Sequence, residues 1–305
     1  YSSIFDQNEF SNIGNSVILK SIPYSKLLDK EDTSIDKLVN IQEPIVTYVA
    51  TALYKFNGTT LEEGLLDSSG NSYTLTSSNA NFSNMGIDGR AAYDSGSTTT
   101  RSYLQFPYSL TRQMYSIQTT NGLSFSFWYN LDNDGIGNYA SIFEFSSTQS
   151  DSATTVRFGI GRPTNNILTT FIKNSDDTFA LFNVGSGTLD NTWHHLVWCI
   201  NNTGTWTVYI DGTSQSLSTA TNHPRSIASS TEYNYSYIFD SIQTSEIKGS
   251  IDEFVIYPRV LTQTEVTSIK NKTTIKGITI PTAPEFKYLA FPHSGGSETQ
   301  TPYSV

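Results

Sequence analysis

The sequence predicts an all-β protein, built as an antiparallel sandwich or barrel. Short segments of alternating apolar and polar residues recur roughly every 10–15 residues, which is the spacing typical of such folds. Turn-forming residues separate these segments, and almost no helical pattern lies between them. Aromatic residues make up 13% of the 305 residues, so the apolar faces contain enough bulk for a large core.

The β pattern begins at Ile45, and its clearest strand is "GLSFSFWYNL". There Leu123, Phe125 and Phe127 fall on one face, and Ser124, Ser126 and Trp128 fall on the other. "NNTG" predicts a hairpin turn between "NTWHHLVWCI" and "TWTVYI". The other predicted strands are "PIVTYVATALYKF", "SYLQFP", "YASIFEFSS", "TTVRFGIG", "EYNYSYIF" and "IDEFVIY".

One helix is predicted near the end of this region. Thr262 and Glu265 have the spacing of a capping box, and Val266 and Ile269 then fall on one face. Pro44 and the Thr-, Pro- and Gly-rich stretch after Lys270 mark the domain limits. We therefore expect an arm or linker at 1–44, one domain at 45–270 and an extended tail at 271–305. Because the chain begins at Tyr1 rather than Met, we expect a mature or trimmed fragment.

Charge and composition exclude several classes of partner. The net charge is -10, and 18 Lys and Arg residues are scattered among 28 Asp and Glu residues, so we expect no binding to nucleic acid. No run of apolar residues is long enough to insert into a membrane. Cys199 is the only cysteine, which excludes an intrachain disulfide and predicts a small buried side chain.

Six motifs follow one another along the chain: "LYKFNGTTLEEGLLDSSGN", "GIDGRAAYDSG", "LSFSFWYNL", "TWHHLVWCI", "TVYIDG" and finally "GSIDEFVIYPRVLTQTEV". This ordered set resembles the laminin-G-like, concanavalin-A-like family. The resemblance covers roughly residues 45–270. It implies a two-sheet jelly-roll sandwich that ends in one short C-terminal helix.

The resemblance also implies a structural Ca²⁺ ion. In many such folds an Asp at the start of the closing strand helps to hold this ion, and that position is Asp252 here. Asp67 and Asn57 are its possible neighbours, since carboxylate and amide oxygens suit Ca²⁺. The alternative is that Asp252 only accepts hydrogen bonds from the backbone at the strand start.

Catalysis is disfavoured by the acidic residues. Glycoside hydrolysis needs two carboxyl groups about 5–9.5 Å apart. Asp252 and Glu253 are adjacent in a predicted strand and point to opposite faces, and Glu144 is a single acid on its strand. His194 and His195 diverge for the same reason, so we expect structural histidines and no enzyme.

Carbohydrate binding requires an aromatic platform beside polar groups. Trp128, Tyr233 and Tyr235 are the candidate platform residues, because each lies beside polar neighbours on a predicted strand or rim. The alternative for each is packing between the sheets or under the flanking segments.

The first functional hypothesis is a non-catalytic recognition or adhesion module that binds glycan or a protein surface. Its expected place is extracellular, on a cell surface or on a virus particle. The second is a structural capsid, fibre or surface-layer component that self-assembles through its terminal arms. A glycoside hydrolase or lyase is the third.

Overall fold

The computed structural model describes most of the predicted domain. The described residues are 10–13, 16–19, 49–96, 102–131, 140–150, 152, 154–162, 167–184, 188–228, 232–240 and 247–271. The chain divides into two compact units, residues 1–46 and 47–305. The predicted arm and tail fall almost wholly outside the described residues.

The first unit contains one described antiparallel hairpin. Its strands are β1 (Phe10–Ile13) and β2 (Ser16–Leu19).

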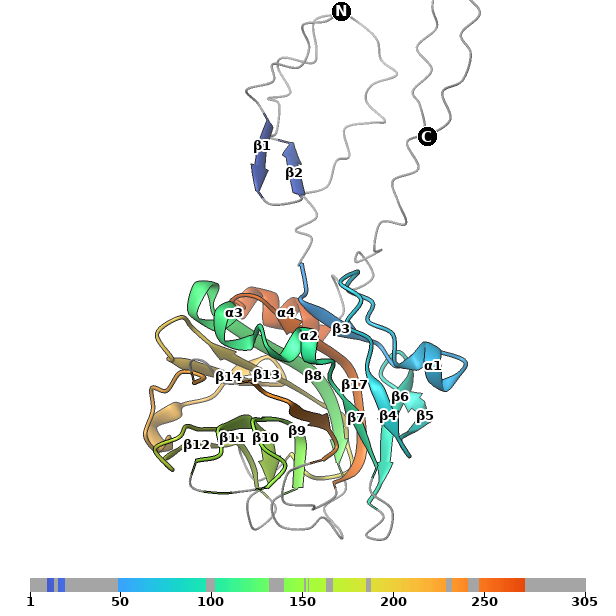
Figure 1. The fold of residues 1–305 in the computed structure, drawn as a ribbon. Coiled ribbons are helices and arrows are strands. Elements are labelled where there is room, and N and C mark those ends of the chain that lie inside the picture. Colours follow the sequence, from blue (N-terminus) through green and yellow to red (C-terminus); the bar gives the residue numbers. More distant parts are fainter. Residues whose placement is uncertain are drawn as a thin grey trace, which may run out of the picture. The chain divides into compact units, whose positions relative to one another are not determined.

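The second unit is a sandwich of two antiparallel sheets (Figure 1). The described strands of the seven-stranded sheet run in the order β12-β11-β10-β9-β16-β7-β4. Their bounds are β4 Thr76–Ser78, β7 Tyr103–Gln105, β9 Ala140–Ser146, β10 Arg157–Arg162, β11 Leu168–Lys173, β12 Phe179–Val184 and β16 Tyr235–Ile238.

The described strands of the eight-stranded sheet run in the order β15-β14-β13-β8-β17-β6-β5, and β3 also pairs with β17. Their bounds are β3 Ala52–Tyr54, β5 Asn81–Gly86, β6 Gly89–Ser95, β8 Leu123–Leu131, β13 His194–Ile200, β14 Trp206–Ile210, β15 Thr213–Ser214 and β17 Lys248–Tyr257. The helices are α1 Leu61–Gly64, α2 Tyr108–Thr111, α3 Met114–Asn121 and α4 Gln263–Asn271, with a 3₁₀ turn at Leu217–Thr219. This architecture confirms the predicted two-sheet sandwich.

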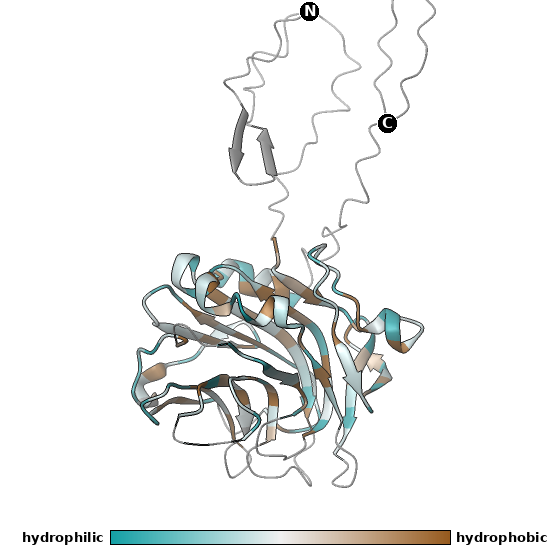
Figure 2. Ribbon diagram, viewed as in Figure 1, coloured by the Kyte–Doolittle hydropathy of each residue, from teal (hydrophilic) through white to brown (hydrophobic). Residues whose placement is uncertain are grey.

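The core lies between the sheets and is dominated by aromatic rings. Phe145 stacks on Phe158 with ring centroids 4.8 Å apart, and Phe127 stacks on Phe254 at 5.5 Å. Burying one such ring stabilises a fold by about 1.5–3 kcal/mol. Figure 2 shows the apolar residues concentrated along the strands, whereas the helix α1 and many turns are hydrophilic.

The closing strand β17 contains a bulge at the acidic pair. The register between β17 and β8 shifts between Asp252 and Val255, and Glu253 has a left-handed backbone with φ of 50°. The extra residue resets the alternation, so that Ile251 and Phe254 both face the core. The regular strand from which Asp252 and Glu253 were expected to point to opposite faces is therefore interrupted at Glu253.

The predicted helix is confirmed as α4, with its capping box. The Glu265 amide donates to Thr262 Oγ1 at 3.3 Å, and the Thr262 amide donates to Glu265 Oε2 at 2.7 Å. Val266 and Ile269 are buried on the outer face of the eight-stranded sheet, together with Cys199.

Helices α2 and α3 and strands β11 and β12 were not predicted. The two helices follow Pro107, which precedes the first helical residue, but their apolar pattern is weak. The segment "LTTFIK" is buried on both faces, which removes the alternation that marks a strand. In "FALFNV" the burial does alternate, but apolar residues stand on both faces of the strand, so the sequence shows no polar face.

Candidate functional site

Strand pairing lines up two rows of side chains on the outer face of the seven-stranded sheet. Directly opposite residues of paired strands share a face. The first row, called the glutamate row, contains Thr76, Gln105, Tyr237, Glu144, Gly159, Phe171 and Leu181. The second, called the arginine row, contains Tyr235, Ser146, Arg157, Lys173 and Phe179.

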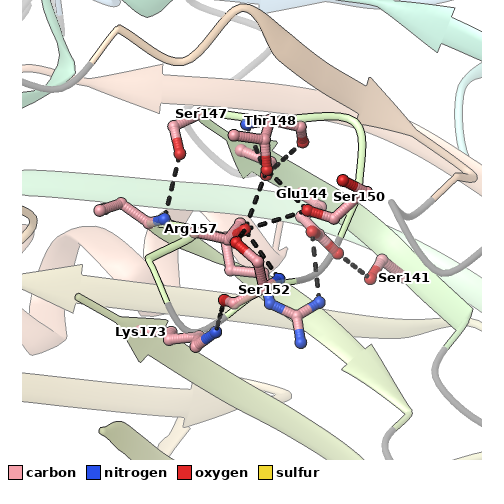
Figure 3. A network of polar contacts seen from close by, with 11 residues as sticks. Ser141, Glu144, Ser147, Thr148, Ser150, Ser152, Arg157 and Lys173 are labelled. Carbon is pink, nitrogen blue, oxygen red and sulfur yellow. Dashed lines mark hydrogen bonds and ion pairs between the residues drawn. The ribbon is translucent and has the colours of Figure 1, made fainter. Parts of the chain in front are cut away.

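The centre of these rows contains the charged side chains of Glu144, Arg157 and Lys173 (Figure 3), and all three are buried. Glu144 is 1% exposed, and its Oε1 lies 3.5 Å from Nη1 of Arg157. Its other oxygen accepts a hydrogen bond from Ser141 at 2.9 Å. Removing one partner of such a buried pair leaves an uncompensated charge, which typically costs about 3–5 kcal/mol.

Aromatic rings and an exposed acid enclose the two cations. The Arg157 guanidinium lies 5.5 Å from the ring centroid of Phe171 and 5.2 Å from that of Phe179. Lys173 is 2% exposed, and its Nζ lies 2.9 Å from Asp177. Each cation on this face is thus matched by a carboxylate.

The loop between β9 and β10 fixes this charged centre from one side. The Lys173 ammonium donates to the carbonyl oxygen of Ser152 at 2.5 Å (Figure 3). Ser146 Oγ donates to the carbonyl oxygen of Thr148 at 2.9 Å. Hydroxyl groups of the loop also bond one another, for example Thr148 to Thr155 at 2.9 Å.

The middle of the glutamate row is flat because β10 carries a glycine there. A Cβ on Gly159 would lie 2.2 Å from the carbonyl oxygen of Phe143, so only glycine fits. Glu144 is the only acid among the described residues of the two rows. The rows therefore lack the second carboxyl group that glycoside hydrolysis needs.

The more open end of this face contains the rings of Tyr103, Tyr235 and Tyr237, and we call it the tyrosine end. Tyr103 and Tyr235 are half-buried, and Tyr237 is 6% exposed. The Tyr103 and Tyr237 rings meet edge to face with centroids 4.8 Å apart. Gln105 and Thr76 lie beside them on the glutamate row and supply hydrogen-bonding groups.

The structure separates the three predicted platform residues. Tyr235 lies on the arginine row and belongs to the tyrosine end. Tyr233 does not share that face: it is 1% exposed and packs edge to face on Phe158 in the core. The reason is that β16 begins only at Tyr235, so the alternation does not extend back to Tyr233.

Trp128 lies on the opposite sheet. Its side chain is on the outer face of β8 with Ser126, as the alternation predicts, but it is only 9% exposed and contacts the ring of His195. An open platform at Trp128 is therefore not observed.

The two predicted metal ligands anchor separate backbone turns. Asp252 Oδ2 accepts from the amides of Ile87 and Asp88 at 2.7 and 3.2 Å, and its Oδ1 accepts from the Glu253 amide at 2.8 Å. Burial raises the pKa of Asp252 to about 7.

Asp67 is engaged in the same way. Its Oδ1 accepts from the amides of Leu53 and Ser69, and its Oδ2 accepts from the Tyr73 amide and the Ser69 hydroxyl. Within the described part of the chain, no three His, Cys, Asp or Glu side chains gather as a metal site. N–H and O–H donors engage the oxygens of both carboxylates, and the Ca²⁺ ion at Asp252 and Asp67 stays a prediction.

The two adjacent histidines diverge, as the alternation predicts. His194 lies between Asp211 and Asp190, at 2.8 and 3.2 Å. His195 Nε2 lies 2.9 Å from Ser126 Oγ. Burial lowers the pKa of His195 to about 3, so its ring is neutral at physiological pH.

The comparison with known families agrees with this architecture. Residues 98–267, more than half of the chain, match the family described as the Concanavalin A-like lectin/glucanases superfamily, of laminin-G type. The chain belongs to this family. No curated protein matches the sequence.

Solved structures of the same fold include binding domains. Domain 4 of AbnA, a GH43 extracellular arabinanase from Geobacillus stearothermophilus, solved in complex with arabinotriose, is 19% identical with a TM-score of 0.52, and the match covers 72% of this chain and 98% of that one. The binding domain of Paraclostridial Mosquitocidal Protein 1 is 18% identical with a TM-score of 0.53, covering 73% and 52%.

A third structure is the binding domain of botulinum neurotoxin DC in complex with rat synaptotagmin II. It is 15% identical with a TM-score of 0.52, and the match covers 73% of this chain and 51% of that one. This chain thus spans about half of the toxin binding domains. At these identities the likeness is one of fold. In the described residues, no helix has the length and apolar character needed to cross a membrane.

The polar network of Glu144, Arg157 and Lys173 was the part of the site that sequence reasoning missed. A sequence pattern that indicates this network is present in "IFEFSS" and "VRFGIG", where a charged residue alternates with Phe on two consecutive strands. Only the pairing of β9 with β10 brings the two charges together.

Proposed function

We propose that this domain is a non-catalytic recognition module that binds glycan at the tyrosine end of the seven-stranded sheet. The observation that carries the proposal is the arrangement of half-buried Tyr103 and Tyr235 beside Gln105 and Thr76. Tyrosine rings stack on the apolar faces of sugars, and the amide and hydroxyl groups bond sugar hydroxyls.

The buried ion pair supports binding rather than catalysis. Glu144 is held by Arg157 and Ser141, and no second carboxyl group faces it among the described residues of the two rows. Its role in the proposal is to keep the centre of the face rigid, so that the tyrosine end is preorganised for its ligand.

The fold relatives are consistent with this proposal. One of them was solved with arabinotriose, and it belongs to an extracellular enzyme. Another was solved with synaptotagmin II, a protein. By the same reasoning the module acts outside the cell, on a secreted protein, a cell surface or a virus particle.

A glycan array read with four variants tests the proposal. We expect the wild-type chain to bind specific glycans, and Tyr235→Ala or Tyr103→Ala to weaken binding about tenfold, because each removes one stacking ring. Tyr115→Ala removes a half-buried tyrosine on α3, away from this face, and is the matched control. Tyr235→Phe keeps the ring and should retain most of the affinity.

Two results would contradict the proposal. Equal binding by Tyr235→Ala, Tyr103→Ala and the wild type would remove the tyrosine end as the site. No binding to any glycan by a folded chain would redirect the search to a protein partner, or to a structural role.

A further inference from the structure

The segment 221–226 connects the edge of one sheet to a strand of the other, and we call it the strap. At its start Thr221 pairs with Leu181 of β12, which is the edge strand of the seven-stranded sheet. The Leu181 amide donates to the Thr221 carbonyl oxygen at 3.1 Å, and the Thr221 amide donates to the Leu181 carbonyl oxygen at 2.8 Å. The strap therefore occupies hydrogen-bonding groups that the edge of β12 would otherwise leave open.

The other end of the strap is fixed to β14 of the eight-stranded sheet, on the same side of the sandwich as β12 (Figure 1). The Trp206 amide donates to Nε2 of His223 at 2.9 Å, and the Trp206 indole donates to the Arg225 carbonyl oxygen at 2.8 Å. The Arg225 amide in turn donates to the carbonyl oxygen of Gly204 at 2.9 Å. One of the bonds that hold the strap to β14 thus ends on a titratable ring.

The bond between Trp206 and His223 requires a neutral imidazole. A backbone amide can only donate, so Nε2 accepts and the ring proton lies on Nδ1. Protonation of the ring would place an N–H on Nε2 as well, facing another donor, and the bond would be lost. The His223 side chain is only half-buried, so protons from the solvent reach it. Histidine is also the residue type whose ordinary pKa lies close to neutral pH.

The charged groups near the strap pair with one another rather than with His223. Nη2 of Arg225 lies 2.6 Å from Oδ1 of Asp176, in the turn between β11 and β12. Asp177, in the same turn, pairs with Lys173. The turn before β14 and the strands β12 and β14 contain no acidic or basic residue. The pKa of His223 is lowered, and the cause is burial.

We infer that the strap is an acid-released cover on the edge of the seven-stranded sheet. Above pH ~6.5 the ring is neutral in the folded and the unfolded chain, and the bond from Trp206 is fully present. As the pH falls from there through the lowered folded pKa of His223, the ring gains a proton and the strap loses this attachment to β14.

Release of the strap uncovers the backbone pairing groups of Leu181, and an open strand edge is where another strand adds. The strap lies at the opposite edge of the seven-stranded sheet from β4 and β7 of the tyrosine end. It therefore does not depend on the proposed function, and its failure would leave that proposal unchanged.

NMR of the full chain tests the inference at the ring itself. The chain has four histidines, and His223→Gln assigns the signals of interest. At pH 8 we expect ring ¹⁵N shifts that report a proton on Nδ1 and an acceptor at Nε2. Between pH 8 and pH 4.5 we expect the ring to titrate with a midpoint below pH ~6.5, together with the Trp206 backbone amide. The opposite tautomer at pH 8, or a ring that stays neutral to pH 4.5, would overturn the inference.

Amide hydrogen exchange measures the release of the strap. We expect the protection factors of the Leu181 and Thr221 amides to fall about tenfold between pH 8 and pH 4.5, as the loss of one hydrogen bond implies. Protection factors are compared because intrinsic exchange rates themselves depend on pH. The Leu196 amide of β13, a strand paired on both sides, is the internal reference and should keep its protection.

Variants of the strap separate titration from simple weakening. His223→Gln keeps an acceptor that cannot titrate, so the protection of Leu181 should no longer depend on pH. His223→Phe removes the acceptor at every pH and should lower that protection at pH 8 to the value that the wild type reaches at pH 4.5. Asn222→Ala is the matched control, because it removes only the bond to the Phe179 carbonyl oxygen at 2.8 Å and should weaken the strap equally at both pH values.

Two exchange results would also overturn the inference. A pH dependence in His223→Gln as large as that of the wild type would assign the effect to another group. Constant protection of Leu181 in the wild type while the His223 ring titrates would show that the strap holds without this bond.

Discussion

His194 is a residue whose protonation links the stability of this fold to pH. Burial lowers the pKa of its ring, but hydrogen bonds to Asp211 and Asp190 outweigh that effect, and the net shift is upward. The raised pKa means that protonated His194 stabilises the folded chain fully below pH ~6.5, its unfolded value. This contribution disappears as the pH rises through the folded pKa.

We therefore expect His194→Gln to remove a pH-dependent part of the stability. Urea unfolding between pH 5 and pH 9 measures it, and the difference between wild type and variant should be largest at the acidic end. A difference that stays constant with pH would show that the contacts of His194 matter without its charge. Asn121→Gln, an exposed polar residue at the end of α3, provides a comparison.

At the same scale, the sequence predicted the strand face of a side chain better than its exposure. Trp128 lies on the face that alternation assigns to it, yet its neighbours bury it. Tyr233 was misplaced because alternation cannot reveal where a strand begins. Asp252 accepts hydrogen bonds from backbone amides, as the alternative to a metal ligand predicts, although the sequence does not display which amides they are.

Among the elements, α4 depends on its capping box. Thr262 accepts from the Glu265 amide and thereby satisfies one of the amides that a helix start leaves unpaired. We expect Thr262→Ala to lower the free energy of unfolding by about 1 kcal/mol. Thr267→Ala, an exposed position inside the same helix, is the control, and chemical denaturation measures both. Equal losses in the two variants would argue against capping as the cause.

Elements with strong alternation or turn signals were predictable, and those without them were not. The hairpin of β13 and β14 follows from "NNTG" between two apolar segments. By contrast, β11 carries Thr169, Thr170 and Lys173 at buried positions, so its polar residues conceal the strand. The ammonium group of Lys173 donates to the carbonyl oxygen of Ser152 in the loop before β10 and pairs with Asp177. The Asp177 contact is local, but the Ser152 contact joins residues 21 positions apart, which the sequence does not display.

At the scale of the molecule, the first and last elements of the sandwich, β3 and α4, pack against each other. β3 pairs with β17, and Leu53 of β3 packs in the same cluster as Val266 and Ile269 of α4. We expect a chain of residues 47–271 to unfold cooperatively with a Tm within about 4 °C of that of the full chain. Calorimetry measures this. A chain that stops at 247 lacks β17 and α4 and should not fold, and a large loss of Tm in the 47–271 chain would contradict the expectation.

The central position of β17 in its sheet also affects when the domain can fold during translation. This strand lies between β8 and β6 and pairs with β3 as well, although all three precede it by more than a hundred residues. During translation, at about 5–20 residues per second, the earlier strands emerge from the ribosome many seconds before their partner does. One edge each of β8 and β6 therefore stays unpaired over that interval, which exposes the nascent chain to mispairing until β17 has been synthesised.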